Sequence, residues 1–204
     1  MILYLIRHGK SRDGAKGLSQ RVDAELDIES RIHLESLKNF LKDIKFDRIY
    51  SSPQPRAYQT AEVLFGQKFE HLEYIHESIR PKYLIGKKIE LAVKFWDEEK
   101  RVERYDADWK HKGSESFKEA IDRVNKFTLQ LKKHQNNEKV AAITHGWFIR
   151  HFIGTLLMGE KYTPEVFFDL LRKIEIGNGG FVIFELDFKT KSYKILEISN
   201  QCSH

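Results

Sequence analysis

The chain has 204 residues, enough for one domain with a substantial hydrophobic core. Hydrophobic residues make up 41% and charged residues 32%, which excludes a disordered or fibrous chain, and no apolar run is long enough to span a membrane. The formal net charge of +5 suits either nucleic acid or phosphate ligands. Because the basic residues are dispersed and form no nucleic-acid-binding motif, we expect neither a nucleic-acid nor a membrane partner.

The single cysteine, Cys202, can form neither an intramolecular disulfide nor a cysteine-rich metal site. This cysteine usage favours a reducing compartment. The residues after Met1 lack the basic, apolar and small-residue succession of a secretory signal. We therefore expect a cytoplasmic location.

The chain opens with a short apolar segment, residues 2–6, that runs into Arg7, His8 and Gly9. Its composition predicts a buried strand that ends at a tight turn, which glycine permits. Open α/β sheets bind ligands at the carboxyl ends of their strands. The first candidate site residues are therefore Arg7 and His8.

The next part of the chain is predicted to be a polar loop over residues 10–27 and an amphipathic helix over about 29–43. A second short strand is expected at 46–50. After it, Ser51 to Pro53 has the pattern of a helix N-cap followed by proline at the first helical position. The helix that starts there would carry Arg56.

Residues 71–75 are predicted to form a third strand. Residues 77–113 alternate aromatic side chains, Trp96 and Trp109 among them, with many charges. We expect this segment to be a small, mostly helical cap inserted into a single domain that spans residues 1–204. Packing within the cap is the commoner use of tryptophan, with the inner face of the cap touching the substrate.

The last third of the chain begins with Ser116 and Glu119, whose spacing is that of a capping box and predicts a long helix. A second buried strand, residues 140–144, then ends in His145 and Gly146 and is followed by a helix over about 147–157.

Two terminal strands, residues 181–186 and 193–198, are expected to be joined by a polar turn. Strands that alternate with helices predict an α/β protein. The fold we expect is a three-layer α/β/α sandwich with a mostly parallel central sheet, an antiparallel edge and the small helical cap.

Two strands thus end in the same His-Gly pair, and in a parallel sheet both ends lie on the same side. With Arg7 and Arg56, this site would hold two guanidinium groups beside the imidazoles of His8 and His145. Guanidinium groups match phosphate oxygens, and fixed cations stabilise a phosphoryl transition state. An imidazole nitrogen can accept the phosphoryl group as a nucleophile, so this chemistry requires no metal or other cofactor.

Four segments of the chain resemble those of the histidine phosphatase superfamily, also called phosphoglycerate mutase-like, and they occur in the family's order. They are Leu5 to Gly9, Ser51 to Ala61, Gly113 to Ser116, and Thr144 to Gly146. The resemblance covers most of the chain outside the cap.

The resemblance implies a role for each matching residue. His8 matches the nucleophile that becomes phosphohistidine, and Arg7 and Arg56 match the arginines that clamp the phosphate. His145 matches the second histidine, which polarises the phosphoryl oxygens. Glu77, matched only by its order along the chain, corresponds to the acid that protonates the leaving oxygen.

The residues after the first His-Gly pair depart from the usual family pattern. Lys10 and Ser11 stand where many members have Glu or Gln and then Thr, and resemble the bacterial phosphohistidine phosphatases. We expect Lys10, Ser11 and Gly146 to contribute to the phosphate site. Gly14 stands where many members place an asparagine, so one usual phosphate contact is missing.

The function expected from these residues is metal-independent hydrolysis of a small-molecule phosphomonoester through phosphorylated His8. Three alternatives remain open: phosphoryl transfer of the phosphoglycerate mutase type, hydrolysis of protein phosphohistidine, and phosphoester binding without catalysis. The sequence leaves open which ester is used and whether the protein is a monomer or a homodimer.

Overall fold

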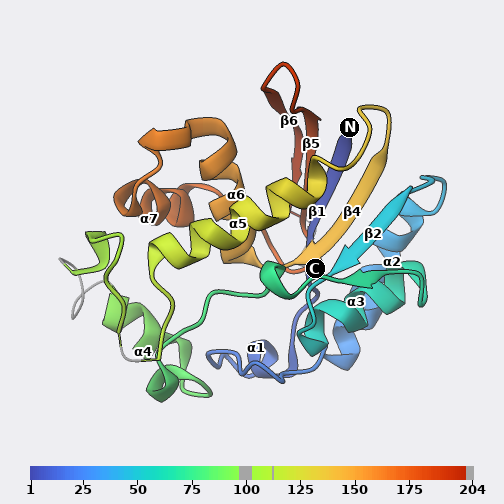
Figure 1. Ribbon diagram of the computed structural model, residues 1–204. Helices are drawn as coiled ribbons and strands as arrows, with labels where there is room; N and C mark the ends of the chain where they lie inside the picture. Colours follow the sequence, from blue (N-terminus) through green and yellow to red (C-terminus); the bar gives the residue numbers. More distant parts are fainter. Residues whose placement is uncertain (97–102, 112, 201–204) are drawn as a thin grey trace.

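The computed structural model of the protein describes residues 1–96, 103–111 and 113–200 (Figure 1). Its six-stranded sheet has the order β3-β2-β4-β1-β5-β6. β1, β2, β3 and β4 are mutually parallel, β5 is antiparallel to β1, and β6 is antiparallel to β5. The predicted parallel sheet with an antiparallel edge is therefore confirmed. The strands are β1 (Ile2–Arg7), β2 (Arg48–Ser51), β3 (Glu70–His71), β4 (Lys139–Thr144), β5 (Phe181–Asp187) and β6 (Ser192–Ser199).

Helices cover both faces of the sheet, which confirms the three-layer sandwich (Figure 1). Successive residues of a strand point to opposite faces. Leu3 and Leu5 of β1 therefore pack against one pair of helices, and Tyr4 and Ile6 pack against the other pair. The first pair is α5 (Phe117–Leu131) and α6 (Gly146–Met158), and the second is α2 (Ile28–Leu41) and α3 (Pro55–Phe65).

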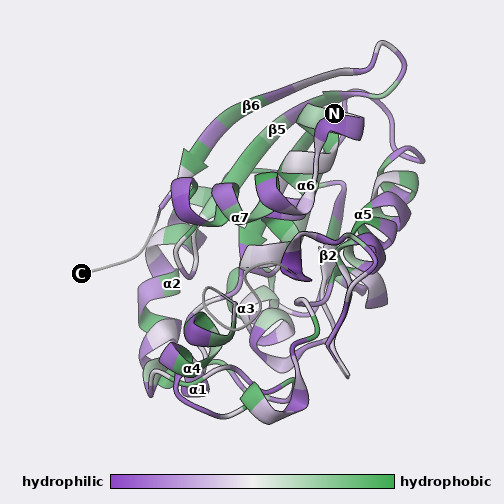
Figure 2. Ribbon diagram, turned by 90° about the vertical axis from the view of Figure 1, so that its left-hand side faces the viewer, coloured by the Kyte–Doolittle hydropathy of each residue, from purple (hydrophilic) through white to green (hydrophobic). Residues whose placement is uncertain are grey.

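The two central strands are apolar on both faces because helices cover them from both sides. Figure 2 shows the neighbouring strand β5 as largely hydrophobic, with hydrophilic and hydrophobic residues alternating along α2 and α5. β1 and β4 pair in parallel with Arg7 opposite Thr144. This register brings the residues that follow, His8 and His145, to the same edge of the sheet.

The helix after β2 begins two residues later than predicted. Its N-cap is Gln54 and its first residue is Pro55. Ser52 does not act as the cap, because its hydroxyl group forms a hydrogen bond with the His145 ring instead. A proline does occupy the first helical position, as predicted, but it is Pro55 and not Pro53.

The predicted third strand was too long. Only Glu70 and His71 pair with β2, and a 3₁₀ helix, Glu73–Ile75, follows. The hydroxyl group of Thr144 donates a hydrogen bond of 2.6 Å to the Ile75 carbonyl. The chain is thereby drawn over the end of β4 instead of continuing along the sheet edge.

The described part of the cap contains only short helices. They are a 3₁₀ helix, Lys82–Leu84, the helix α4 (Ile89–Lys94) and a second 3₁₀ helix, Glu103–Tyr105. Trp96 and Trp109 pack against a small apolar cluster of the cap. In Figure 1, α4 lies at the end of the molecule where α1 (Arg12–Ala15) is also found, away from the sheet.

Two α-helices and the 3₁₀ helix Gly159–Lys161 were absent from the sequence-based prediction. α1 (Arg12–Ala15) is a single turn within the expected loop. α7 (Pro164–Lys173) is capped by the Thr163 hydroxyl group and packs Phe167 and Phe168 toward the cap. Of the helices in the described ranges, none is both long and apolar enough to cross a bilayer.

Candidate active site

Two imidazole rings meet at the carboxyl edge of the central strands. The ring centroids of His8 and His145 are 4.9 Å apart, and both side chains are completely buried. They are separated by most of the chain, but the parallel pairing of β1 and β4 places them side by side. The predicted juxtaposition of the two His-Gly ends is thus present.

Two hydrogen bonds fix the His8 ring. Its Nδ1 donates to the Gly9 carbonyl oxygen at 2.6 Å, and its Nε2 lies 3.3 Å from Arg56 Nε, which donates to it. A carbonyl oxygen can only accept, so the proton resides on Nδ1. Nε2 therefore carries a lone pair.

Both imidazoles are held in the neutral form. Burial lowers the pKa of His8 well below its ordinary value, and the charges of Arg56 and Arg7 lower it further. The pKa of His145 is likewise lowered, first by burial and then by Arg56. Since the neutral ring is the nucleophilic form, the site is prepared for chemistry on nitrogen at neutral pH.

Arg56 is a buried cation with its donors firmly held. Nη2 donates to Gln54 Oε1 at 2.5 Å and Nη1 to the Arg21 carbonyl at 3.1 Å. Arg21 is itself fixed by Asp13, with N–O distances of 2.8 and 3.1 Å. Burial lowers the pKa of Arg56 to about 10, which leaves it protonated at neutral pH. Arg56 thus places a permanent positive charge beside His8.

The His145 ring has one nitrogen committed and one available. Nε2 lies 2.9 Å from the Ser52 hydroxyl oxygen. Nδ1 is buried and forms no hydrogen bond with any residue of the described ranges. Because a buried polar atom is costly without a partner, Nδ1 is an atom that a ligand could satisfy.

A polar cleft of about 370 Å³ is lined by Arg7, which precedes His8, and by Gly146, which follows His145. The described residues that line the cleft do not include His8, His145 or Arg56, and both imidazoles are completely buried. Arg7 also donates from Nη1 to the Ile176 carbonyl at 2.6 Å. Gly146 opens α6, whose N-terminal NH groups favour an anion.

Of the other predicted site residues, Glu77 lines the cleft, whereas Lys10 and Ser11 do not. Glu77 lines the cleft, and its Oε1 accepts a hydrogen bond of 3.0 Å from the Ser78 backbone. Lys10 is exposed, and neither it nor Ser11 is among the described residues that line the cleft. Ser11 instead caps α1, because its hydroxyl oxygen accepts from the Gly14 backbone at 3.1 Å.

Gln20 is a cleft residue that the sequence analysis missed. A Cβ atom built on Gly14 would lie 3.2 Å from Gln20 Nε2, so the Gln20 amide occupies the space of the absent side chain. Both residues line the cleft. The sequence signal for this was Gly14 itself, which stands where many family members have asparagine and leaves room for another polar side chain.

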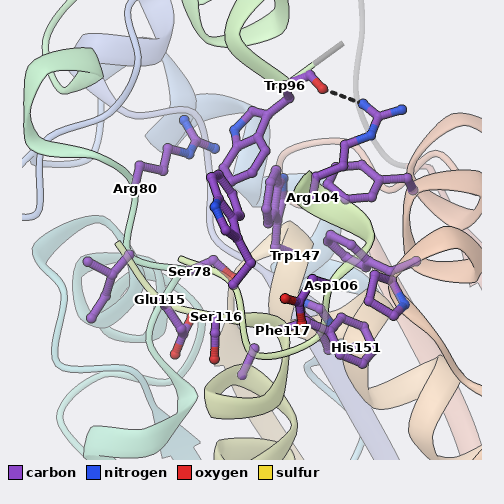
Figure 3. A pocket seen from close by; sticks show the side chains of 16 residues that line it. Ser78, Arg80, Trp96, Arg104, Asp106, Glu115, Ser116, Phe117, Trp147 and His151 are labelled. Carbon is purple, nitrogen blue, oxygen red and sulfur yellow. Dashed lines mark hydrogen bonds between the residues drawn. The ribbon is translucent and has the colours of Figure 1, made fainter. Parts of the chain in front are cut away.

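Asn178 and Arg80 were also missed. Asn178 Nδ2 donates to the His8 carbonyl at 3.1 Å, and its position in a glycine-rich segment before β5 was an available turn signal. Arg80 donates to the Ser19 hydroxyl at 3.2 Å, and its guanidinium carbon lies 5.7 Å from the Trp147 ring centroid. Figure 3 shows Arg80 and Trp147 on the same cavity. No local sequence pattern marked Arg80.

The described residues contain no group of three or more His, Cys, Asp or Glu side chains placed to hold a metal ion. The groups gathered at the cleft are mainly cationic or neutral donors: Arg7, Arg80, Arg150, Gln20 and Asn178. Donors of this kind bind anions and not metal cations.

Residues 3–199 match the model of the histidine phosphatase superfamily (branch 1). The chain therefore belongs to the histidine phosphatase superfamily, as the four sequence segments predicted. Over 61 residues it is 48% identical to the curated protein named "Putative phosphoserine phosphatase 2" of Hydrogenobacter thermophilus. That match covers 29% of this chain and 30% of the relative.

Solved structures share the fold across nearly the whole chain. A phosphoserine phosphatase of Entamoeba histolytica in complex with 3-phosphoglyceric acid has a TM-score of 0.77 at 24% identity, covering 97% of this chain and 96% of that one. A mycobacterial glucosyl-3-phosphoglycerate phosphatase has a TM-score of 0.77 at 20% identity and covers 98% of both chains. The alpha-ribazole phosphatase of Shigella flexneri has a TM-score of 0.76 at 19% identity, covering 98% and 97%.

Proposed function

We propose that the protein is a metal-independent phosphatase that hydrolyses a small-molecule phosphomonoester through a phosphohistidine intermediate on His8. The observation that carries this proposal is the fixed tautomer of His8, with a lone pair on Nε2 next to the buried cation Arg56. The names of the relatives, which are phosphatases of different phosphate esters, support the same reaction class.

In the first step, His8 Nε2 attacks phosphorus while the bond between phosphorus and the alcohol oxygen breaks. Arg7 and Arg56 balance the charge on the equatorial oxygens. Where Ser52 donates to His145 Nε2, the proton of His145 lies on Nδ1, which can then donate to a phosphoryl oxygen. Glu77, on the cleft wall, gives its proton to the departing alcohol.

In the second step, water attacks phosphorus and the bond to His8 Nε2 breaks. The Glu77 carboxylate takes a proton from this water, which returns Glu77 to its acid form. Inorganic phosphate leaves, and His8 recovers its lone pair. A mutase would differ only in its acceptor, a hydroxyl group of the substrate in place of water.

The test is the substitution His8→Ala, assayed by release of p-nitrophenol from p-nitrophenyl phosphate. We expect turnover to be abolished, since His8 Nε2 is the atom that accepts the phosphoryl group in the proposed mechanism. The matched control is His33→Ala, which removes an exposed histidine on α2 and should leave turnover unchanged. Full activity of His8→Ala would refute the mechanism.

A quenched-flow experiment tests the intermediate itself. With a labelled ester, we expect the wild-type protein to carry an acid-labile phosphoryl group that is absent from His8→Ala. Release of inorganic phosphate from 3-phosphoglycerate identifies a phosphatase, whereas formation of an isomerised phosphoglycerate identifies a mutase. Tight phosphate binding without turnover of any ester would favour the non-catalytic alternative.

A further inference from the structure

The polar cleft continues into a second, largely apolar groove of about 210 Å³. Four residues line both cavities, so the two are contiguous and not separate depressions: Arg80, Ile89, Trp147 and Leu171. A molecule held by its phosphoryl group in the cleft therefore has this groove as a direct extension.

The groove lies between the cap and the last two helices. Its cap side is formed by α4, where Ile89 and Val93 are one turn apart and thus share a face. These two side chains remain 39% and 53% exposed, although both are apolar. The groove thus presents an uncovered hydrocarbon surface directly beside a site for a phosphate anion.

The opposite wall is aromatic and aliphatic. Trp147 of α6 and Phe168 of α7 lie with ring centroids 6.0 Å from that of Trp96, and Figure 3 shows Trp96 and Trp147 side by side. Leu171 of α7 completes this wall. The wall therefore offers packing surface to a hydrocarbon and few hydrogen bonds to a polar group.

The two cations of the groove already have polar partners. Arg80 donates to Ser19 and lies over Trp147. Arg172, at the α7 end, is 3.9 Å from Asp169. Both residues line the groove.

We propose that this groove binds the hydrocarbon part of the substrate's alcohol, so the preferred substrate class is a phosphomonoester of an apolar alcohol. This inference rests on the proposed function, because it assumes that the cleft binds the phosphoryl group of a substrate. Arg80 stands at the junction of cleft and groove, where the ester oxygen would join the anionic and apolar halves of the molecule.

Calorimetric titration of the wild-type protein with n-alkylphosphonates, from methyl to octyl, tests this directly, because a carbon–phosphorus bond is not hydrolysed. We expect the Kd to fall by up to about fourfold for each methylene group that enters the groove, with an increasingly negative heat capacity of binding. A Kd independent of chain length overturns the proposal. So does a failure of every phosphonate, methylphosphonate included, to bind.

A matched pair of variants assigns the effect to the groove. Val93→Lys places a charge in it, whereas Leu91→Lys changes a neighbour on α4 that is 50% exposed and does not line the groove. We expect Val93→Lys to abolish the chain-length dependence without changing the Kd of methylphosphonate. Leu91→Lys should retain the dependence. Loss of the dependence in both variants, or in neither, overturns the proposal.

The competing ligand is an alcohol with a second anionic group, held by Arg80. Tighter binding of 3-phosphonopropionate than of propylphosphonate would overturn the apolar assignment. Failure of the proposed function is distinguishable from failure of this inference. Chain-length-dependent binding without ester hydrolysis would refute only the proposed function. Hydrolysis through His8 with binding that is independent of chain length would refute only the apolar groove as a substrate site.

Discussion

His8 acquires its chemical character from neighbours that are distant in the sequence as well as adjacent. The Gly9 carbonyl holds the proton on Nδ1, and Arg56 Nε faces Nε2. Asn178, from the far end of the chain, donates to the His8 carbonyl and so fixes the backbone. A histidine in this setting is neutral and oriented before any ligand arrives, which lowers the reorganisation needed for reaction.

A comparison of two leaving groups distinguishes an acid role of Glu77 from a general loss of activity in the variant. In Glu77→Gln, we expect kcat for an alkyl phosphate to fall by roughly 10²- to 10⁴-fold, because the alkoxide then leaves without a proton. For p-nitrophenyl phosphate the loss should be much smaller, since p-nitrophenolate is a stable anion. Steady-state kinetics with both esters measures the difference.

The control for this prediction is Glu73→Gln, which changes an exposed glutamate nearby and should affect neither ester. An equal loss on both esters would contradict an acid role for Glu77. If phosphohistidine peptide is the best substrate and its turnover survives Glu77→Gln, the phosphohistidine phosphatase alternative is favoured, because a phosphoramidate needs no strong acid.

At the scale of elements, a buried ion pair at the start of α5 holds Arg123, which in turn connects α5 to the segment before Glu77. Arg123 donates to Glu115 at 2.5 and 2.7 Å, and the side chains are only 9% and 5% exposed. Arg123 also donates to the carbonyls of Tyr74 and His76 at 3.0 and 2.8 Å. Glu115 precedes the N-cap Ser116 and forms this ion pair with Arg123.

Breaking this pair should be costly. In Glu115→Gln, the Arg123 charge stays buried without its counter-ion, and we expect the free energy of unfolding to fall by about 3–5 kcal/mol. Urea denaturation measures it. Asp108→Asn is the matched control, because it breaks an exposed ion pair with Lys118 and should cost less than about 1 kcal/mol. Equal effects of the two substitutions would refute the structural importance of the buried pair.

At the scale of the whole molecule, stability should depend on pH through buried histidines. Burial lowers the pKa of His151 to about 3, and the charge of Arg123 lowers it further. The pKa values of His8 and His145 are lowered as well. An unfolded histidine has a pKa of about 6.5, so below that pH the unfolded chain binds more protons than the folded one. Stability is therefore lost as the pH falls from about 6.5.

The contribution of His151 can be measured by difference. We expect His151→Phe to reduce the loss of unfolding free energy between pH 7 and pH 5 by about 2 kcal/mol, because one proton-binding group of the unfolded chain is removed. Urea denaturation at the two pH values gives the comparison, and any packing change cancels in it. The exposed His33→Ala should leave the pH dependence unaltered. An unchanged slope in His151→Phe would refute the assignment.

Local pattern was sufficient for the two central strands and for the start of α5. The apolar runs before His8 and His145 specified two buried strands, because only a strand covered on both faces is apolar throughout. The capping box at Ser116 and Glu119 specified the start of α5, where both of its hydrogen bonds are present. These features depend on neighbours a few residues apart, which a sequence displays directly.

Only the tertiary structure decided which side chains meet between distant segments. Ser52 has the local pattern of a helix cap, yet its hydroxyl group binds His145. Gln20 fills the space beside Gly14, and Arg80 joins the cleft to the apolar groove. A hydroxyl, amide or guanidinium group has several possible partners of similar energy, and the choice among them is made by the packing of the whole chain. The sequence by itself therefore determined the fold class and the candidate side chains that follow the two central strands, while the tertiary structure decided which side chains surround them.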